Sequence, residues 1–495
     1  MAGSRSRSLG ALVEEVQARA PGLISNAAAL IKADAQTQIS SITQDSRAVV
    51  PGGLFGAIRG YAADGHDYVD AAVSAGAVAV LVESERSLAG ASSDVVQIIS
   101  ADTARATGYL AAALFGQPSE RGSLVAVTGT NGKTSVVTIL AHLVNNCGRV
   151  AASMGTLTGS LTTAAAPDFQ ASLDSHFTDG ATVVAAEVSS HALDQQRIAG
   201  SKVAVAIFTN LSQDHLDYHA DMDEYFEAKA RLFSDDFAAD HVIDVSDPYG
   251  AKLAERLGHD GSAGRALIKV DGKAIAEAGT LKQGSSTFTW RDREIALPLG
   301  GSFSVNNAVM AAEAAVLLGC TEDAVATALA SVPAVPGRFE SVDAGQPFAV
   351  VIDYSHTPAS VAAAVQSARQ LTSGSVILVF GAAGDRDPGK RPLMGRAAAA
   401  ADRLYVTSDN PRTEDPAKII DEVVAGIPTH GEIHVVTDRA QAISQAISGA
   451  GPEDIVVIAG KGHEDYQIVG TTRTHFDDRE EALRALRARG WDVSA

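Results

Sequence analysis

The feature that most constrains this chain is the stretch VAVTGTNGKTSVV at 125–137, which predicts a strand, a glycine loop and a helix in immediate succession. Val127 stands where the common phosphate-binding pattern G-x-x-x-x-G-K-[ST] has its first glycine. The remaining pattern, G-x-x-G-K-T at 129–134, still offers backbone N–H groups, a helix N-terminus and one lysine. We therefore predict that this loop binds nucleotide phosphates. The alternatives are a solvated strand-to-helix turn and, on the loop alone, a switch GTPase or a kinase.

Bulk composition restricts the class of protein further. A chain of 495 residues is too long for one hydrophobic core, so several domains are expected. The formal net charge of -20 argues against duplex nucleic acid as a partner, because neutralising phosphates requires clustered Lys and Arg. Cys147 and Cys320 are the only cysteines, which argues against a disulfide framework or a cysteine zinc site. The N-terminus lacks an apolar signal-peptide core and no run of about 18 apolar residues occurs, so a cytoplasmic protein without membrane insertion is expected.

Strand-like apolar runs alternate with Ala-rich helical stretches along the whole chain, which predicts an α/β fold with parallel sheets. We expect three domains: an N-terminal domain at 1–102, a central P-loop parallel-sheet ATPase domain at 103–339 and a C-terminal Rossmann-like domain at 340–495. In the last domain four apolar runs end in polar tips: FAVVIDYSHTP, SVILVFGAAGDRD, RLYVTSDNPRTEDP and DIVVIAGKGHEDY. Because ligands collect beyond the carboxyl ends of parallel strands, these tips predict one rim of a site.

Three further segments of the central domain carry chemistry-bearing side chains. Glu187 follows the apolar run in VVAAEVSSHALDQQR, a position suited to a magnesium ligand, although such a residue is often only solvated. The segment AIFTNLSQDHLDYH gathers His215 with neighbouring Asp and His residues, which favours metal or phosphate chemistry or a hydrogen-bonded turn. Lys229, in FEAKARLF, reads by itself as a solvated helical lysine.

Taken together, these segments resemble one family. GTNGKTS, EVSSHALDQQR, TNLSQDHLDYH, FEAKARLF, NNAVMA, PGRFE, DYSHTP, GDRDPGKRP, DNPRTEDP and GKGHEDYQ occur in the order found in the Mur ligases of peptidoglycan synthesis. The resemblance runs from Gln44 to about Gln467 and is strongest to the members that add diaminopimelate. It implies ATP-dependent addition of meso-2,6-diaminopimelate to the D-glutamate of UDP-N-acetylmuramoyl-L-alanyl-D-glutamate through an acyl phosphate, by a monomer. A lysine-adding ligase and a ligase like folylpolyglutamate synthase are the alternatives.

The resemblance also implies roles for individual residues around ATP. Lys133, Lys229, Glu187 and His215 would be catalytic. ATP would be bound by Gly129, Thr130, Asn131, Gly132, Lys133, Thr134, Ser135, Asn306, Arg338, Asp353 and His356. Two Mg²⁺ ions would be held by Thr134, Glu187, His215 and Lys229, the last as a carbamate formed with carbon dioxide. Carbamylation would turn a cation that repels magnesium into an oxygen ligand. For Asp353 and His356 the residues alone favour strand-end capping.

The UDP-sugar dipeptide is implied to contact a second set of residues: Ser46, Tyr61, Ala62, Ala63, Thr162, Thr163, Ser189, Gln195 and Arg197. Two positions depart from the family pattern. Ala164 stands where the family usually has proline, which leaves the rigidity of this loop uncertain, and Ala383 stands where glycine is common.

The segment SDNPRTEDP predicts which amino acid is added. Pro411 and Pro416 stiffen the turn from which Arg412 projects, and a guanidinium there suits bidentate capture of a carboxylate. Diaminopimelate carries a second carboxylate that lysine lacks, so such a site would reject lysine by about 10⁴–10⁵. A surface ion pair of Arg412 with Glu414 or Asp415 is the alternative. The diaminopimelate-binding residues implied by the resemblance are Arg386, Asp409, Asn410, Pro411, Arg412, Gly460 and Glu464.

Overall fold

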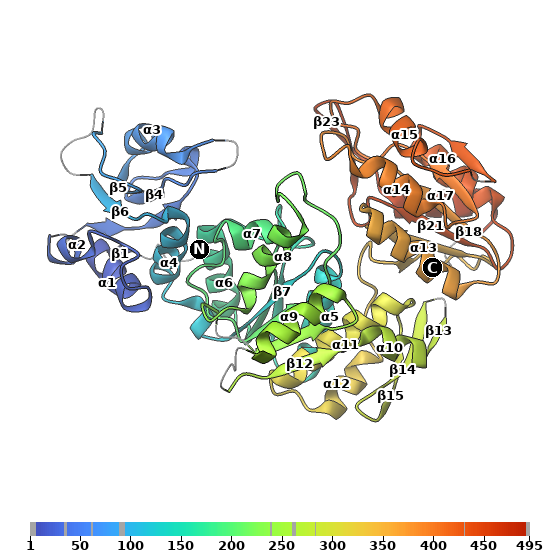
Figure 1. Cartoon of the computed structure of the whole chain (residues 1–495), viewed down its shortest axis with the longest axis horizontal. Coiled ribbons are helices and arrows are strands. Elements are labelled where there is room, and N and C mark those ends of the chain that lie inside the picture. The colour runs from blue at the N-terminus through green and yellow to red at the C-terminus, as the bar shows by residue number, and fades with distance from the viewer. Residues whose placement is uncertain are drawn as a thin grey trace. The chain divides into compact units, whose positions relative to one another are not determined.

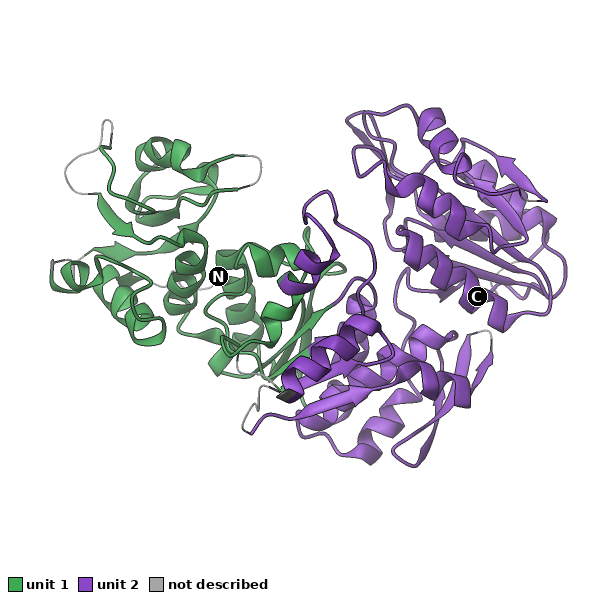
Figure 2. Ribbon diagram, viewed as in Figure 1, with its two compact units in different colours: residues 1–128, 148–206, 228–240 green, residues 129–147, 207–227, 241–495 purple. Residues whose placement is uncertain are grey.

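The structure is a computed structural model and describes residues 6–33, 37–60, 63–88, 95–237, 240–259, 264–282, 284–429 and 431–491. Two compact units are found, one comprising residues 1–128, 148–206 and 228–240 and the other residues 129–147, 207–227 and 241–495 (Figure 2). No helix in these described ranges combines the length and apolar character needed to cross a membrane. The three functional domain ranges given above stay a prediction.

The first unit opens with a four-stranded parallel sheet in the order β3-β4-β5-β6 (Figure 1). Its strands are Ser41–Thr43, Gly53–Gly56, Ala77–Val82 and Val96–Ile99, and β1 (Arg7–Ser8) pairs antiparallel with β2 (Gln38–Ile39). The helices here are α1 (Leu9–Arg19), α2 (Ala27–Ala33), α3 (Val69–Ser74) and α4 (Thr103–Leu114), with short 3₁₀ turns at Ser46–Ala48 and Gly65–Tyr68. Along β5, Ala79 and Leu81 join one apolar cluster while Val80 and Val82 join the other, so both faces of the sheet are covered.

A six-stranded sheet follows, in the order β12-β11-β10-β7-β9-β8. The first unit contributes β7 (Ser123–Thr128), β8 (Ala151–Met154) and β9 (Val183–Glu187), which pair in parallel. The other strands are β10 (Val205–Phe208), β11 (Asp240–Asp244) and β12 (Leu267–Val270). The first unit also contains α6 (Ala166–Thr178) and α7 (Ser190–Asp194), with 3₁₀ turns at Pro118–Glu120 and Arg231–Phe233. All five residues of β9 are buried, as expected of a parallel strand covered on both faces.

Helices and a small antiparallel sheet complete the central part of the chain. The helices are α5 (Lys133–Asn146), α8 (Met222–Ala230), α9 (Pro248–His259), α10 (Gly272–Ala278), α11 (Ser302–Leu317) and α12 (Glu322–Leu329). The sheet has the order β13-β14-β15 and consists of Thr280–Lys282, Ser285–Trp290 and Arg293–Leu297. In α11 most residues are buried, so this helix lies inside the second unit and not on its surface.

The C-terminal sheet has the order β16-β17-β21-β18-β19-β20. Its strands are Glu340–Ser341, Ala349–Asp353, Val376–Phe380, Arg403–Val406, Ile433–Val435 and Ile455–Ala459, and all except the edge strand β16 run parallel. One face is covered by α13 (Pro358–Leu371), α14 (Lys390–Ala398) and α15 (Pro416–Val424), the other by α16 (Arg439–Gly449) and α17 (Asp478–Ala488). The hairpin β22–β23 (Tyr466–Val469, Thr472–His475) follows β21. The predicted α/β class with parallel sheets is confirmed, and the polar tips follow β17, β18, β19 and β21 at one edge.

Candidate active site

The glycine loop lies where a phosphate-binding loop is expected, between the end of β7 at Thr128 and the start of α5 at Lys133. Gly129 and Gly132 have φ angles of 147° and 86°, which L side chains rarely adopt. A Cβ at Gly129 would overlap the hydroxyl of Thr209, so only glycine fits there. The loop backbone is therefore shaped by both of its glycines.

The segment 209–212 braces this loop from the side. Asn210 accepts from the Asn131 N–H through Oδ1 at 2.9 Å and donates from Nδ2 to the Asn131 carbonyl at 3.1 Å. The Thr209 hydroxyl donates to the same carbonyl at 2.6 Å, and the Thr130 N–H donates to the Asn210 carbonyl at 2.9 Å. Asn210 thus positions the loop through both ends of its side-chain amide.

The Lys133 ammonium donates hydrogen bonds to the backbone of its own loop. Lys133 Nζ donates to the carbonyls of Gly129 and Thr130, both at 2.9 Å. Thr134 and Ser135, in the first turn of α5, are buried. Arg338 donates from Nη2 to the Thr134 hydroxyl at 3.0 Å, and its guanidinium lies 4.3 Å from the centre of the Tyr354 ring. Arg338 and Thr134, both predicted to bind ATP, are therefore in contact within the second unit.

In the described part of the chain, the side-chain amide of Asn306 is hydrogen-bonded through its nitrogen only. Its Nδ2 donates to Asp244 Oδ2 at 2.5 Å, while its buried Oδ1 has no hydrogen-bond partner among the described residues. Burial raises the pKa of Asp244, against the hydrogen bonds from Ser246 and Asn306. An unsatisfied buried acceptor is costly, so Oδ1 is suited to a ligand that carries an N–H or O–H group.

Asp353 and His356 have structural partners at the end of β17. Asp353 accepts from the backbone N–H groups of Phe339 and Ser355, at 2.8 and 2.9 Å, and from the Ser355 hydroxyl. His356 Nδ1 lies 2.7 Å from the Tyr354 carbonyl. Burial raises the pKa of Asp353 and lowers that of His356. Both side chains do what strand-end capping requires, and their contact with ATP stays a prediction.

His215 lies in a charged neighbourhood inside the second unit. Its backbone is left-handed, with φ 54°, and its Nε2 lies 3.5 Å from Asp214 Oδ2. Burial opposes ionisation of Asp214, but the basic groups of His215, His356 and Lys390 outweigh it and hold the pKa of Asp214 below its usual range. The ring of His219 stacks on Tyr225 with centroids 5.1 Å apart, so this histidine is part of the packing.

In the first unit, Glu187 ends β9 with its side chain buried (2 % exposed). The Thr156 N–H donates to Oε1 at 2.9 Å and the Thr156 hydroxyl to Oε2 at 3.1 Å. A Cβ at Gly155 would overlap the carboxylate, so the loop approaches it too closely for any side chain. Thr156 was missed by sequence reasoning, because nothing in GTLTG marks one threonine as a carboxylate partner.

Five residues predicted to bind the UDP-sugar dipeptide form one hydrogen-bonded group beside Glu187. Thr162 approaches Thr156 with their hydroxyl oxygens 3.3 Å apart, and the Thr163 hydroxyl donates to the Glu187 carbonyl at 2.9 Å. The Ser189 N–H donates to the Thr163 hydroxyl at 3.1 Å. Arg197 donates from Nη1 to the Thr163 carbonyl and from Nη2 to Gln195 Oε1, both at 2.7 Å.

The remaining residues predicted for the UDP-sugar lie in the N-terminal sheet region. Ser46 is half-buried in the 3₁₀ turn after β3, and Ala63 is exposed, with its carbonyl accepting from the Gly60 N–H at 2.9 Å. Tyr61 and Ala62 lie outside the described residues.

Lys229 differs from what its sequence alone predicts. It lies in α8 with only 1 % of its surface exposed, so the interpretation as a solvated lysine is wrong. Lysines are almost never fully buried without a specific partner or function. The pattern FEAKARLF could not reveal this, because a charged residue in a short helix usually marks its solvated face.

In the C-terminal domain three of the residues predicted to bind the amino acid lie around a buried lysine. Lys461 is 0 % exposed and donates to Asn410 Oδ1 at 3.2 Å, with Asp409 Oδ1 at 3.9 Å and Glu464 Oε2 at 3.7 Å. Asn410 Nδ2 donates to Glu464 Oε2 at 2.9 Å. A Cβ at Gly460 would lie 2.5 Å from Asp409 Oδ2, so this glycine permits a close approach. Lys461 was absent from the predicted residues although it lies within GKGHED.

Arg412 projects from a backbone held on both sides. Its N–H donates to the Ile468 carbonyl at 3.0 Å and its carbonyl accepts from the Gly470 N–H at 2.6 Å, which ties the turn to the β22–β23 hairpin. Within the described ranges its guanidinium has no ion-pair partner, and its buried Nε has no hydrogen-bond partner. Glu414 pairs instead with Arg391, and Asp415 caps α15, so the alternative of a surface ion pair is wrong. Arg386 is exposed in the loop after β18, and Pro411 is buried.

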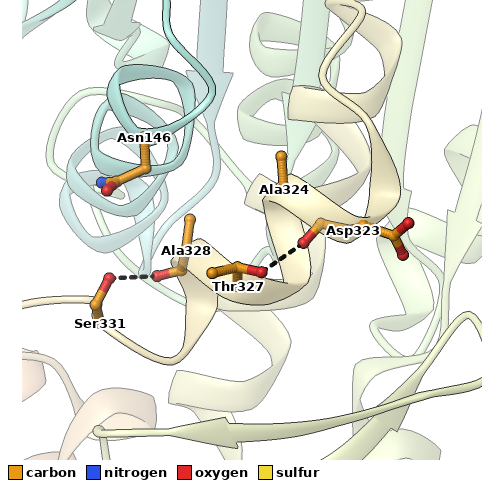
Figure 3. Close-up of a pocket in the computed structure, with 6 residues that line it drawn as sticks. All are labelled: Asn146, Asp323, Ala324, Thr327, Ala328 and Ser331. Carbon is orange, nitrogen blue, oxygen red and sulfur yellow. Dashed lines mark hydrogen bonds between the residues drawn. The ribbon is translucent and has the colours of Figure 1, made fainter.

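A pocket of about 300 Å³ opens elsewhere in the second unit, lined by Asn146, Asp323, Ala324, Thr327, Ala328 and Ser331 (Figure 3). None of these residues belongs to the predicted site. Its polar groups are already engaged: Asp323 accepts from Arg293 at 2.8 Å, and the Ser331 hydroxyl donates to the Ala328 carbonyl at 3.1 Å. The pocket therefore adds nothing to the candidate site.

Comparison with known proteins decides the family. Models of the Mur ligase family catalytic domain, the Mur ligase middle domain and the Mur ligase glutamate ligase domain match residues 38–114, 127–315 and 337–462. A UDP-N-acetylmuramoyl-L-alanyl-D-glutamate–2,6-diaminopimelate ligase from Synechococcus is 42 % identical over 97 % of this chain and 99 % of its own. The chain belongs to the Mur ligase family.

Other Mur ligases agree in fold and length. The diaminopimelate ligase of Geobacillus kaustophilus is 38 % identical over 91 % of this chain and 96 % of its own. A solved structure of such a ligase superposes with a TM-score of 0.64 at 32 % identity, covering 92 % of this chain and 96 % of its own. The MurF ligase of Thermotoga maritima in complex with ADP shares the fold, with a TM-score of 0.61 at 20 % identity over 91 % of this chain and 98 % of its own.

Proposed function

We propose that this Mur ligase joins meso-2,6-diaminopimelate to the D-glutamate of UDP-N-acetylmuramoyl-L-alanyl-D-glutamate with consumption of ATP, as a step of peptidoglycan synthesis. The observation that carries the choice of amino acid is the guanidinium of Arg412, held on a doubly bonded turn without an ion-pair partner among the described residues. A planar guanidinium without an ion-pair partner can bind a carboxylate of a ligand through two parallel hydrogen bonds.

The reaction we propose has two steps. A carboxylate oxygen of the D-glutamate attacks the γ-phosphorus of ATP, the bond from that phosphorus to the bridging oxygen breaks, and ADP leaves. The amine of diaminopimelate then attacks the acyl carbon, phosphate leaves, and the nitrogen loses a proton. The loop at 129–134 and Lys133 would bind the phosphates and offset the charge that collects on them during transfer. Arg338, already hydrogen-bonded to Thr134, is placed to add a second cation there.

Magnesium would be held by Thr134, Glu187, His215 and a carbamate on Lys229, and within the first unit the Glu187 carboxylate is chemically suited to it. Each Glu187 oxygen accepts one hydrogen bond from Thr156 and so retains lone-pair capacity, and hard cations prefer oxygen ligands. In the part of the chain that the structure describes, no group of three or more His, Cys, Asp or Glu residues is placed to hold a metal ion. The proposed ligands include only two such residues, Glu187 and His215, and the other two are a threonine and a carbamylated lysine. Bound magnesium would neutralise phosphate charge during transfer.

Carbamylation of Lys229 is part of the proposal and is supported by its burial (1 % exposed). A buried ammonium loses its hydration, whereas an uncharged amine can react with carbon dioxide to give an oxygen-bearing anion. The UDP-sugar dipeptide would contact the hydrogen-bonded group around Thr162 and Thr163, and diaminopimelate would contact the hydrogen-bonded pair Asn410 and Glu464. We further propose that the protein acts as a monomer in the cytoplasm.

Phosphate release with defined substrate pairs tests this function. The purified protein with ATP and magnesium should release phosphate only when UDP-N-acetylmuramoyl-L-alanyl-D-glutamate and meso-diaminopimelate are both present. L-lysine in place of diaminopimelate should support release at or below about 10⁻⁴ of that rate. Release that depends on folate and glutamate would instead identify a folylpolyglutamate-synthase-like ligase, and nucleotide binding without stimulated release would overturn the proposal.

A further inference from the structure

Two neighbouring loops of the C-terminal domain are joined by two carboxylates, one in each loop, that accept hydrogen bonds from the opposite loop. One loop follows β18 and the other follows β19, which are adjacent parallel strands. The Asp385 carboxylate accepts from the Thr413 hydroxyl at 2.7 Å and from the Thr413 N–H at 3.2 Å. In return, the Glu414 carboxylate accepts from the Asp385 N–H at 2.6 Å. We call Asp385, Thr413 and Glu414 the loop latch.

A buried arginine donates hydrogen bonds to the Glu414 carboxylate of the latch. Arg391, at the start of α14 and 1 % exposed, donates to both Glu414 oxygens, at 2.7 and 2.9 Å. It donates also to Glu422 on α15 at 2.7 Å. The Arg391 guanidinium and the Asp385 N–H together hold the pKa of Glu414 at about 2, so this carboxylate stays charged at neutral pH.

The backbones of the two loops also approach closely. The Gly384 N–H donates to the Asn410 carbonyl at 2.9 Å, and a Cβ at Gly384 would overlap the Pro411 carbonyl. Asp385 and Arg412 both have left-handed backbones, with φ 52° and 53°. Non-glycine residues keep this conformation only where their surroundings enforce it. The latch supplies that enforcement on the loop that carries Arg386 and the loop that carries Arg412.

We propose that the loop latch and Arg391 are positioning residues that set amino-acid specificity by fixing the two loops from which Arg386 and Arg412 project. This inference rests on the proposed function, since it concerns the carboxylate that distinguishes diaminopimelate from lysine. Arg386 directly follows Asp385 in the chain, and Arg412 directly precedes Thr413. Bidentate recognition by a planar guanidinium tolerates little displacement, so loosening either loop weakens capture of the carboxylate.

Matched variants separate positioning from general stability. Glu414→Gln and Glu422→Gln each weaken a charged pair with the same Arg391, through two bonds for Glu414 and one for Glu422, but only Glu414 also binds the other loop. Thr413→Val removes the hydroxyl bond to Asp385, whereas Thr413→Ser keeps it. For each variant, KM is measured for diaminopimelate, ATP and the UDP-sugar dipeptide, together with kcat/KM for L-lysine and the melting temperature.

We expect Glu414→Gln and Thr413→Val to raise KM for diaminopimelate about tenfold and to lower the preference for diaminopimelate over lysine by a similar factor. KM for ATP should stay within about twofold, Thr413→Ser should restore the wild-type value, and Glu422→Gln should resemble wild type in every KM. Equal effects of Glu414→Gln and Glu422→Gln on KM would overturn the inference, as would identical behaviour of the two Thr413 variants. The Thr413 pair decides alone if Glu414→Gln does not fold. A wild-type enzyme inactive with diaminopimelate would instead overturn the proposed function itself.

Discussion

Arg338 donates a hydrogen bond to the hydroxyl of Thr134 over 3.0 Å, which joins the segment leading into the C-terminal domain to the first turn of α5. The guanidinium is oriented by the ring of Tyr354, 4.3 Å away. The segment that connects two of the predicted domains therefore reaches the predicted phosphate-binding loop through one side chain.

For this contact we predict that Arg338→Met raises KM for ATP about tenfold and leaves KM for diaminopimelate within about twofold, because a charged donor next to the phosphates is lost. Initial-rate measurements over a range of ATP concentrations test it. Arg369→Met serves as a control, since Arg369 forms only a partly exposed pair with Asp402 and a bond to the Gly374 carbonyl. An unchanged KM for ATP would show that Arg338 does not act on the nucleotide.

Lys133→Ala should lower turnover by about 10³-fold or more while the protein stays folded, because the ammonium is expected to neutralise the transferred phosphate. Steady-state phosphate release and a thermal melt measure the two properties separately. Lys252→Ala is the control, because Lys252 is half-exposed and pairs with Asp223. Near-full activity of the Lys133 variant would remove the phosphate-binding role from the loop.

Lys229→Ala should be inactive and should regain part of its activity with short carboxylic acids, whose oxygens can replace those of a carbamate. Activity is measured with and without added acid, alongside Lys273→Ala, which changes an exposed lysine. Electron density for an unmodified lysine directed at solvent in an active magnesium complex would contradict this prediction.

Arg412→Ala should lose most of its activity with diaminopimelate, and the loss should be confined to the amino-acid step. The reason is that the second carboxylate of the substrate would lose its bidentate partner. Partial reactions that report acyl-phosphate formation without the amino acid should remain close to wild type. Comparable wild-type turnover with lysine and diaminopimelate would be incompatible with this role for Arg412.

A stability prediction concerns the buried ion pair of Arg439 and Asp478, both 0 % exposed, in which two bonds of 2.7 Å join α16 to α17. Arg439→Met should cost roughly 3–5 kcal/mol of unfolding free energy, because it leaves a buried carboxylate uncompensated. Arg484→Met, which breaks a pair between an arginine that is 71 % exposed and the partly buried Glu481, should cost less than about 1 kcal/mol. Chemical denaturation compares the two, and equal losses would mean that burial does not govern these pairs.

Much of the architecture could be predicted from the sequence because it follows from short-range pattern. The apolar run at 125–127, the glycines at 129 and 132 and the helix after them locate the glycine loop between β7 and α5. The four polar tips of the C-terminal domain likewise follow apolar runs of strand length. Parallel pairing then places Asp353, Asn410 and Gly460 at one edge of a sheet.

What the sequence could not supply depends on contacts between distant segments. The burial of Lys229 and Lys461 follows from what packs over them, which periodicity does not encode. The bonds of Thr156 to Glu187 and of Asp385 to Thr413 join residues 31 and 28 positions apart. Threonine and aspartate in loops have many local uses, so neither pairing has a signal of its own.

The left-handed backbone of Arg412, with φ 53°, has a consequence for how this position would evolve. A side chain in that conformation costs roughly 1–2 kcal/mol, and glycine or asparagine would relieve most of it. In a library randomised at position 412, selection for folded protein alone would enrich those two residues. Selection for growth that depends on the cell wall would enrich arginine. Selection for stability and selection for growth would thus favour different residues at position 412.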